Sequence, residues 1–297
     1  MSKQHLYGGQ AVIEGVMIRG KHYSSIGVRN PSGNIILKTD PLSSIFTGKL
    51  RQFPLIRGMI ILAETLILGM KALSYSANVQ LEEEGQELSK LSIGLMITFS
   101  LLFAIGIFFI APLFAIRVFD SYISSSLVSN FIEGLIRLVI FAVYIFLIGR
   151  MADIKRVFAY HGAEHMTIHA RENGEDLNIE NVRKYPTAHP RCGTAFLLVV
   201  MVVAIIVFAF LGRPPLEWRI LSRIILIPLI AAASYEIIRF SGTHSKNMLV
   251  KFITAPNLAM QSLTTRQPDD DQIEVAIAAV TEAIKADEGK SSLVSTE

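Results

Sequence analysis

The sequence has a single cysteine, Cys192, among its 297 residues, so it excludes an intramolecular disulfide. Charged residues make up only 18% of the chain. Its lysines and arginines are spread out instead of clustering with aromatic residues, which gives no basis for predicting a nucleic-acid partner. The first nine residues contain no apolar core, and we therefore expect no signal peptide.

Apolar sequence is what the chain has in excess. Hydrophobic residues make up 51% of it and the mean hydropathy is +0.45, more apolar than is usual for a soluble domain. Crossing a bilayer takes about 20 mostly apolar residues, and four stretches qualify: 92–116, 131–149, 194–211 and 220–238. The fourth is the weakest, because Arg223 and Glu236 lie near its ends. In the second, Glu133 and Arg137 are four residues apart and are predicted to pair on one helix face.

The lysines and arginines between these stretches predict the orientation in the membrane. Ten precede the first stretch and seven lie in residues 150–193, whereas Arg117 stands alone between the first and second stretches. The short third connection holds Arg213 and Arg219, and the sequence after the fourth stretch is basic again. Because basic residues favour the cytoplasmic side, we predict that both termini and the 150–193 loop face the cytoplasm.

Residues 54–76 are also apolar and long enough to span, but they carry a polar stripe. Arg57, Glu64, Lys71 and Asn78 recur every seven residues, which places them on one side of a helix. One interpretation is an interfacial or re-entrant helix whose polar stripe faces protein. The alternative is a fifth spanning helix, which would place the basic 150–193 loop outside, against the charge rule.

The two ends of the chain have a different character. Residues 8–40 contain apolar runs separated by a turn-forming sequence at 30–33, which predicts a small β-element. Near the other end, acidic residues at 269–271 are predicted to cap a helix that extends to about residue 286.

The resulting fold class is mainly α: a polytopic membrane protein with about four transmembrane helices, an interfacial or re-entrant helix, a small N-terminal β-element and a C-terminal cytoplasmic helix. We divide the chain into a cytoplasmic β-rich region (1–53), the amphipathic or re-entrant helix with a linker (54–91), a four-helix membrane domain (92–240) that includes the His-rich loop 150–193, cytoplasmic C-terminal helices (241–286) and a disordered tail (287–297).

The densest group of chemically versatile residues is at 160–169. On a helix, His161 and His165 lie one turn apart on the same face, a common arrangement for two imidazoles on one metal ion. Glu164 completes a His-x-x-Glu-His pattern like that of inverted zinc proteases, in which a carboxylate is the general base. One further turn on, His169 could add a ligand or a supporting contact.

A second group follows with His189 and Cys192 at a spacing of three. Together with His161 and His165 they would complete a tetrahedral shell for a divalent transition metal, of which zinc fits best. Such a closed shell is structural, so catalysis requires one of the four to lie outside it. Glu236 is a further carboxylate that could act as a ligand. The alternative is a metal-free polar cluster at the membrane interface.

Glu14 interrupts an apolar, glycine-containing run at 8–20. It is either part of an ordinary edge strand or a carboxylate that stands beside the histidines as ligand or base. We therefore name Glu164 and Glu14 as candidate catalytic carboxylates.

Four motifs together resemble the YqhQ-like family of bacterial membrane proteins: the run at 8–20, Tyr-His-Gly-Ala-Glu-His at 160–165, His-Pro-Arg-Cys-Gly-Thr at 189–194 and the stretch at 263–272. The resemblance covers most of the chain. It implies a multi-pass protein of the bacterial inner membrane and a metal-dependent activity, because the family is described as predicted metal-dependent enzymes. It supplies no substrate.

Two functions follow as hypotheses. The first is a metal-dependent, hydrolase-like enzyme with its site at the cytoplasmic membrane interface. The second is a non-catalytic scaffold or accessory factor for protein insertion or transport, in which a structural metal or a polar cluster fixes the central loop. Both predict the lipid bilayer as surroundings and allow a membrane protein partner or a homo-oligomer, without nucleic acid.

Overall fold

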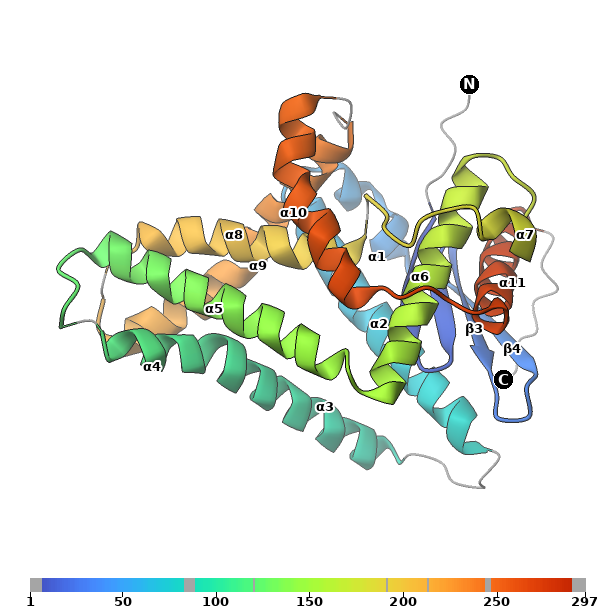
Figure 1. Cartoon of the computed structure of the whole chain (residues 1–297), viewed down its shortest axis with the longest axis horizontal. Coiled ribbons are helices and arrows are strands. Elements are labelled where there is room, and N and C mark those ends of the chain that lie inside the picture. The colour runs from blue at the N-terminus through green and yellow to red at the C-terminus, as the bar shows by residue number, and fades with distance from the viewer. Residues whose placement is uncertain are drawn as a thin grey trace.

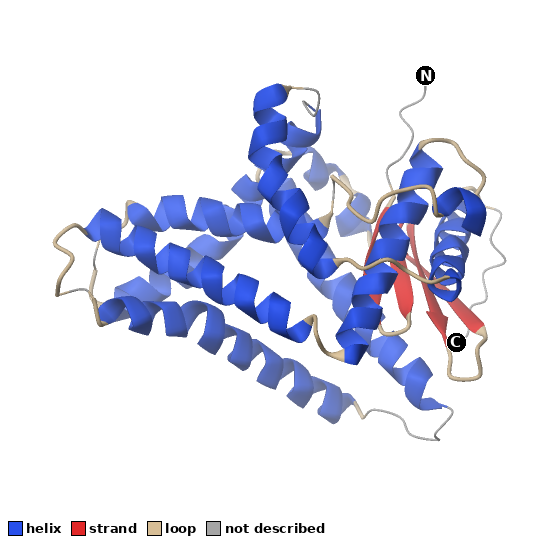
Figure 2. Cartoon of the chain, in the orientation of Figure 1, coloured by secondary structure: helices blue, strands red, loops and turns tan. Residues whose placement is uncertain are grey.

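A computed structural model describes residues 7–82, 89–119, 121–190, 192–212, 214–243 and 247–289. It consists of two regions that lie side by side (Figure 1). Long helices extend to one side, and a small β-sheet with its covering helices forms the other. Within the described residues, strands occur only in the second region (Figure 2). The predicted mainly helical chain with an N-terminal β-element is confirmed.

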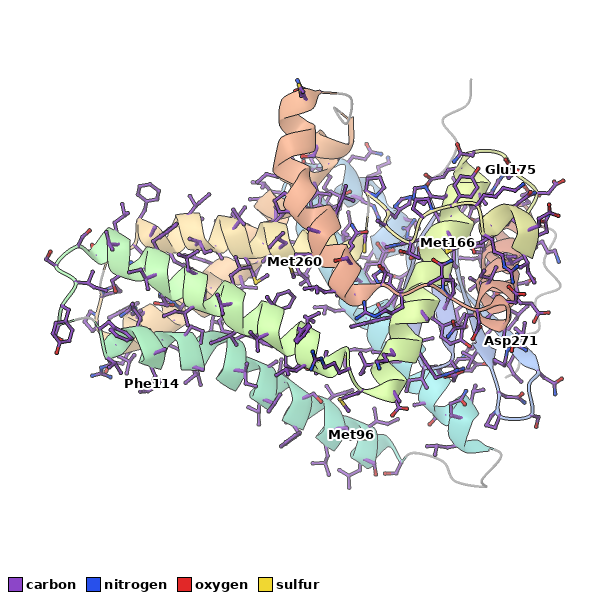
Figure 3. The ribbon with its side chains drawn as sticks, in the orientation of Figure 1. Met96, Phe114, Met166, Glu175, Met260 and Asp271 are labelled. Atoms are coloured by element: carbon purple, nitrogen blue, oxygen red, sulfur yellow. The ribbon has the colours of Figure 1, made fainter. Side chains whose placement is uncertain are left out.

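Among the described residues, three helical segments are long and apolar enough to cross a membrane: Leu91–Arg117, Ser126–Ile148 and Leu216–Ser241. The first comprises α3 (Lys90–Ile105), a π-helical turn η2 (Gly106–Ile110) and α4 (Ala111–Arg117), the second is α5 (Ser126–Ile148), and the third lies in α9 (Leu216–Thr243). Met96 and Phe114 project from the outer face of the first (Figure 3), and both are about half exposed.

The remaining predicted span corresponds to α8 (Gly193–Ala209), which packs against α5 and α9. Its apolar part, Phe196–Ala209, is shorter than the other three. At 1.5 Å per residue, 14 residues extend roughly 21 Å, less than the ~30 Å hydrocarbon core of a bilayer. The structure therefore supports three membrane-length helices and one shorter apolar helix among them.

Glu133 holds the helix bundle together at one end. The predicted contact with Arg137 is confirmed, since the guanidinium donates to the carboxylate at 2.9 Å. Arg219 and Arg223 of α9 donate to the same carboxylate at 2.8 Å. Arg137 also donates to the carbonyl of Phe108 in the π-helical turn, where the wider turn changes which backbone carbonyls are paired. Glu133 is only 1% exposed, so this network is an interior feature of the bundle.

The N-terminal element is an antiparallel sheet of four strands in sequential order: β1 (Gly8–Val12), β2 (Gly15–Arg19), β3 (Tyr23–Arg29) and β4 (Ile35–Pro41). The predicted turn at 30–33 joins β3 to β4, and Gly33 there has φ +88°, a conformation that glycine adopts without strain.

Both faces of the sheet are covered, and the alternation along β2 assigns its side chains to them. Val16 and Ile18 pack against α6 (Ala152–Glu172) and α11 (Asp270–Asp287). Met17, between them, packs on α2 (Ile56–Glu82) on the opposite face. Met166 and Asp271 mark α6 and α11 beside the sheet in Figure 3.

Helix α2 carries the predicted polar stripe, and part of that stripe contacts protein. Arg57 pairs with Glu236 of α9, and Glu64 accepts from Arg19 at 3.0 Å and from Arg51 at 2.5 Å. Lys71 is exposed instead. The other side of the helix exposes large apolar side chains, among them Leu66, Ile67 and Met70. The helix is therefore amphipathic, with ion pairs toward the protein.

The C-terminal region comprises α10 (Met248–Thr264) and α11. The predicted acidic cap of α11 is confirmed, because Asp269 and Gln272 form a reciprocal capping box. Asp287, the first residue of the expected tail, is the last residue of α11 and accepts hydrogen bonds from the backbone amides of Lys21 and His22. The rest of that tail, from residue 290, lies outside the described residues.

Candidate metal centre

Helix α6 presents histidines at every fourth position, because His161, His165 and His169 follow the helical repeat. The stretch is in the interior: His165 is 2% exposed and Glu164 4%. Helix α7 (Ile179–Val182) and the following loop return the chain to this face of α6. The three histidine side chains therefore lie along one face of α6.

Backbone carbonyls fix the orientation of the first two rings. Nδ1 of His161 lies 2.9 Å from the carbonyl oxygen of Thr264, at the end of α10. Nδ1 of His165 lies 2.6 Å from the carbonyl oxygen of Thr187. A carbonyl can only accept, so both rings carry their proton on Nδ1. In the neutral ring this tautomer leaves Nε2 as the nitrogen that can bind a metal, and a carbonyl partner on the other nitrogen is the usual support of metal-binding histidines.

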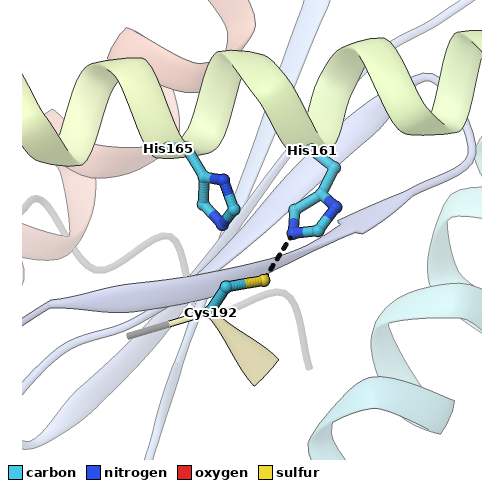
Figure 4. Close-up of side chains that lie close together, drawn as sticks. All are labelled: His161, His165 and Cys192. Atoms are coloured by element: carbon cyan, nitrogen blue, oxygen red, sulfur yellow. Dashed lines mark hydrogen bonds between the residues drawn. The ribbon is translucent and has the colours of Figure 1, made fainter. Parts of the chain in front are cut away.

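Cys192, the residue just before α8, has its side chain next to the rings of His161 and His165 (Figure 4). Its Sγ lies 3.2 Å from Nε2 of His161, and one donor atom from each of the three residues lies within 4.8 Å of the other two. Zinc binds nitrogen at about 2.0–2.1 Å and sulfur at about 2.3 Å, so tetrahedral ligand atoms stand roughly 3.3–3.7 Å apart. The contact between His161 and Cys192 is close to that spacing, and all three donors are of the types that zinc prefers. The residues present fit a divalent transition metal.

Glu164 brings a carboxylate to the same place, with its Oε2 3.5 Å from Nε2 of His165. A cavity of about 50 Å³ adjoins these residues and is also lined by Gly8 and Gly9 of β1. A Cβ on Gly9 would lie 3.1 Å from the Cγ of Glu164 and 2.4 Å from a backbone oxygen, so glycine is needed there. The volume holds a few water molecules, which is enough for a hydrolytic water but not for a large substrate.

His189 lies farther along the row of histidines. Its ring centroid is 5.6 Å from that of His165 and 4.4 Å from that of His169. Burial lowers the pKa of His189, which keeps the imidazole neutral near pH 7. The side chain of Gln261 holds the residue in place, since it accepts from the backbone amide of His189 and donates to its carbonyl.

The structure thus brings together His161, His165 and Cys192 of the predicted shell, whereas the donor atoms of His189 group with His169 and Glu172. Sequence reasoning named neither Glu172 nor Gln261. Glu172 continues the spacing of the α6 histidines, three residues beyond His169, which was the available signal. Gln261 is 72 residues from its partner and no local pattern points to it.

The other carboxylates lie elsewhere. Glu14 is in the turn between β1 and β2, where its carboxylate accepts from Nε and Nη2 of Arg156 at 2.5 Å and from the hydroxyl of Tyr160. A five-residue strand at about 3.3 Å per residue separates this turn from the cavity, which lies at the start of β1. Glu236 pairs with Arg57.

Comparison with known proteins adds two matches. Residues 53–286 match the sequence model of a family described as protein of unknown function (DUF1385). A protein of Bacillus subtilis (strain 168) with the name Uncharacterized protein YqhQ is 32% identical, over 94% of this chain and 92% of its own length. No solved structure matches. The family match contains every residue of the histidine row, and the wider match to the Bacillus protein extends into the N-terminal sheet.

Proposed function

The chain belongs to the DUF1385 family, and we propose from this starting point that it is an integral membrane protein with a metal-dependent, hydrolase-like activity. The proposed metal is a divalent transition ion, zinc in the first instance, held by His161, His165 and Cys192. The observation that carries the proposal is that these donors converge while backbone carbonyls hold Nδ1 of both histidines. A metal-free polar cluster does not require this common tautomer.

The membrane part of the proposal is supported by the three membrane-length apolar helices. We place the metal centre at the cytoplasmic interface, because the basic residues gather on that side of the predicted spans. The centre lies where α8 begins, and the apolar outer face of α2 would lie along the bilayer surface.

Labelling of introduced cysteines in intact cells tests the orientation. In a Cys192→Ser background, Gly174→Cys should be protected from a membrane-impermeant maleimide, whereas Ser121→Cys should react. The reverse pattern would overturn the orientation.

Chemically, a metal at this place would supply Lewis-acid activation of water. Glu164 is the residue of this chain that can accept the proton from that water, since its carboxylate lies within the cavity beside His165. His161 and His165 hold their positions through the carbonyls of Thr264 and Thr187 and need no proton exchange themselves. The narrow, glycine-lined cavity limits what can reach these groups to a small portion of a substrate.

Metal binding is tested on detergent-purified protein loaded with cobalt. Cys192 should give a thiolate-to-cobalt charge-transfer band, and the Cys192→Ser and His161→Ala variants should lose the band and about one equivalent of metal. His22→Ala is the matched control, because His22 is an exposed histidine in the turn before β3. Absence of the band from cobalt-loaded wild-type protein would overturn the proposed ligand set.

Catalysis is tested separately with Glu164→Gln, which preserves the shape of the side chain. Loaded with cobalt, the variant should keep the thiolate band. Loaded with zinc, it should lose hydrolysis of a panel of ester, amide and phosphoester substrates by about 10²–10⁴-fold, the usual contribution of a general base. Equal hydrolysis by wild type and variant would refute the role of Glu164.

One observation favours a structural alternative. The candidate centre joins the start of α8 to α6 and to the end of α10, so a metal there would tie the helix bundle to the sheet region. Under this alternative the protein is a scaffold or accessory factor of the membrane. Metal removal would then lower the thermal stability of the protein in detergent, while Glu164→Gln would leave function in cells unchanged.

A further inference from the structure

A second group of metal-binding side chains lies next to the first, along the same helix. His169 and Glu172 of α6 meet His189, and one donor atom from each lies within 4.8 Å of the others. The two groups are connected by one row of rings: the centroids of His165 and His189 are 5.6 Å apart, and those of His189 and His169 4.4 Å.

The ring of His169 is fixed by a backbone carbonyl, as the rings of the first group are. Nε2 of His169 lies 3.0 Å from the carbonyl oxygen of Ala188 and therefore carries the proton. One ring nitrogen of His169 lies within 4.8 Å of the donor atoms of Glu172 and His189. The ring is also stacked on Tyr185, at a centroid distance of 6.0 Å and an interplanar angle of 8°. Gln261 fixes the backbone of His189 through two hydrogen bonds. The ring of His169 and the backbone of His189 are thus held before any ligand binds.

The contact between His189 and Glu172 is the main alternative, as a simple ion pair. Nε2 of His189 and Oε2 of Glu172 are 3.5 Å apart, whereas a charge-assisted hydrogen bond closes to about 2.7–2.9 Å. A spacing near 3.5 Å is instead close to the separation of two ligand atoms on one ion at metal–ligand distances of about 2.0–2.2 Å. This contact therefore has the spacing of two ligands on one ion, and a donor atom of His169 lies within 4.8 Å of both.

We propose that His169, Glu172 and His189 form a second divalent metal site, so that the protein holds two metals in adjacent sites. Two imidazoles and one carboxylate are the donor set of hydrolytic zinc sites, with three protein ligands and one position left open. The second site lacks a thiolate, and the side chain of Glu172 is 28% exposed. The two sites therefore differ in donor chemistry and in access to solvent, with the second site the more exchangeable.

This inference is independent of catalysis at the first site, and cobalt distinguishes the two sites. Wild-type protein in detergent should bind two equivalents, and only the first site should give the thiolate charge-transfer band. Glu172→Gln and His169→Ala should each bind one equivalent and keep the band. Cys192→Ser should lose the band and keep the second equivalent. Glu175→Gln is the matched control, because Glu175 is an exposed carboxylate just beyond α6.

Dilution into a mild chelator adds a kinetic measurement. The equivalent that depends on Glu172 should leave first, while the thiolate band persists. One equivalent in folded wild-type protein that is retained in both Glu172→Gln and His169→Ala, or two equivalents in both variants, would overturn the second site. A missing band combined with one equivalent that depends on Glu172 would support the second site and reject the first. Far-ultraviolet circular dichroism of each variant shows that a lost equivalent does not come from unfolding.

Discussion

Gly162→Ala is the sharpest test of how the candidate centre is built. Gly162 is inside α6, next to His161, and alanine is the better helix former by about 1 kcal/mol. Helix propensity alone therefore predicts a more stable protein. The structure predicts the opposite, because a Cβ at this position would lie 2.1 Å from the backbone oxygen of Arg266. An ordinary contact is about 3.5 Å, so the segment that follows α10 must retreat by roughly 1.4 Å.

A shift of this segment also removes the backbone carbonyl that holds the ring of His161. The carbonyl of Thr264, two residues before Arg266, holds Nδ1 of His161 at 2.9 Å, and a shift of this size breaks the hydrogen bond. We expect a loss of about 1–3 kcal/mol of stability from overpacking. Loss of a carbonyl support typically weakens metal affinity by about 10–100-fold.

The assay is thermal unfolding in detergent together with a cobalt titration followed by the thiolate band. Gly193→Ala is the matched control: Gly193 adjoins Cys192 at the start of α8, and nothing lies within 4 Å of its added Cβ. It should keep wild-type affinity. A Gly162→Ala protein that is as stable as wild type and binds cobalt equally well would refute the packing of α10 on α6 and the proposed support of His161.

Glu133→Gln should destabilise the helix bundle by about 3–5 kcal/mol, because it leaves three buried guanidiniums without their carboxylate; unfolding in detergent would show this, and an unchanged midpoint would contradict it. Burial raises the pKa of the Tyr160 hydroxyl. It also raises the pKa of Tyr7, to about 12. The folded protein therefore holds these protons more tightly than the unfolded chain, and stability should be full below about pH 10 and fall as the pH rises toward 12. Tyr160→Phe should make this fall shallower, and an unchanged slope would contradict it. Gly9→Ala should weaken cobalt binding by crowding Glu164 and the backbone of β2, whereas Gly8→Ala, with open space around its Cβ, should not; equal affinities would contradict this reasoning.

Local patterns were sufficient for much of the fold. The turn at 30–33 and the acidic cap of α11 are governed by residues close together in sequence, so both could be predicted. The pairing of Glu133 with Arg137 follows from the helical repeat alone. The two further arginines on that carboxylate come from α9, 86 and 90 residues away. Nothing in either segment specifies which helices are neighbours, and the extent of the buried network therefore required the structure.

The candidate centre, too, could be predicted from the sequence only in part. The helical spacing of His161, His165 and His169 could be predicted. The position of His189 could not, because it depends on the path of the loop after α7 and on Gln261 of α10. A spacing of three residues suggested that His189 and Cys192 share one ion. In the structure they lie beside different turns of α6, which divides one expected shell into two groups.

The strongest argument between the enzymatic and the structural interpretation concerns Glu164. This carboxylate is 4% exposed, and burying an ionised carboxylate costs several kcal/mol unless a partner compensates. Its polar neighbour is Nε2 of His165, at 3.5 Å. In the neutral ring that nitrogen has no proton to donate, because the carbonyl of Thr187 fixes the single proton on Nδ1. A positive ion between the two groups resolves the conflict, since Nε2 and the carboxylate can then face the same charge. Without an ion, the compensation would fall to water in the adjoining cavity. A carboxylate that serves as the base for a metal-bound water explains both its burial and its position beside the cavity, which a closed structural shell of four ligands does not.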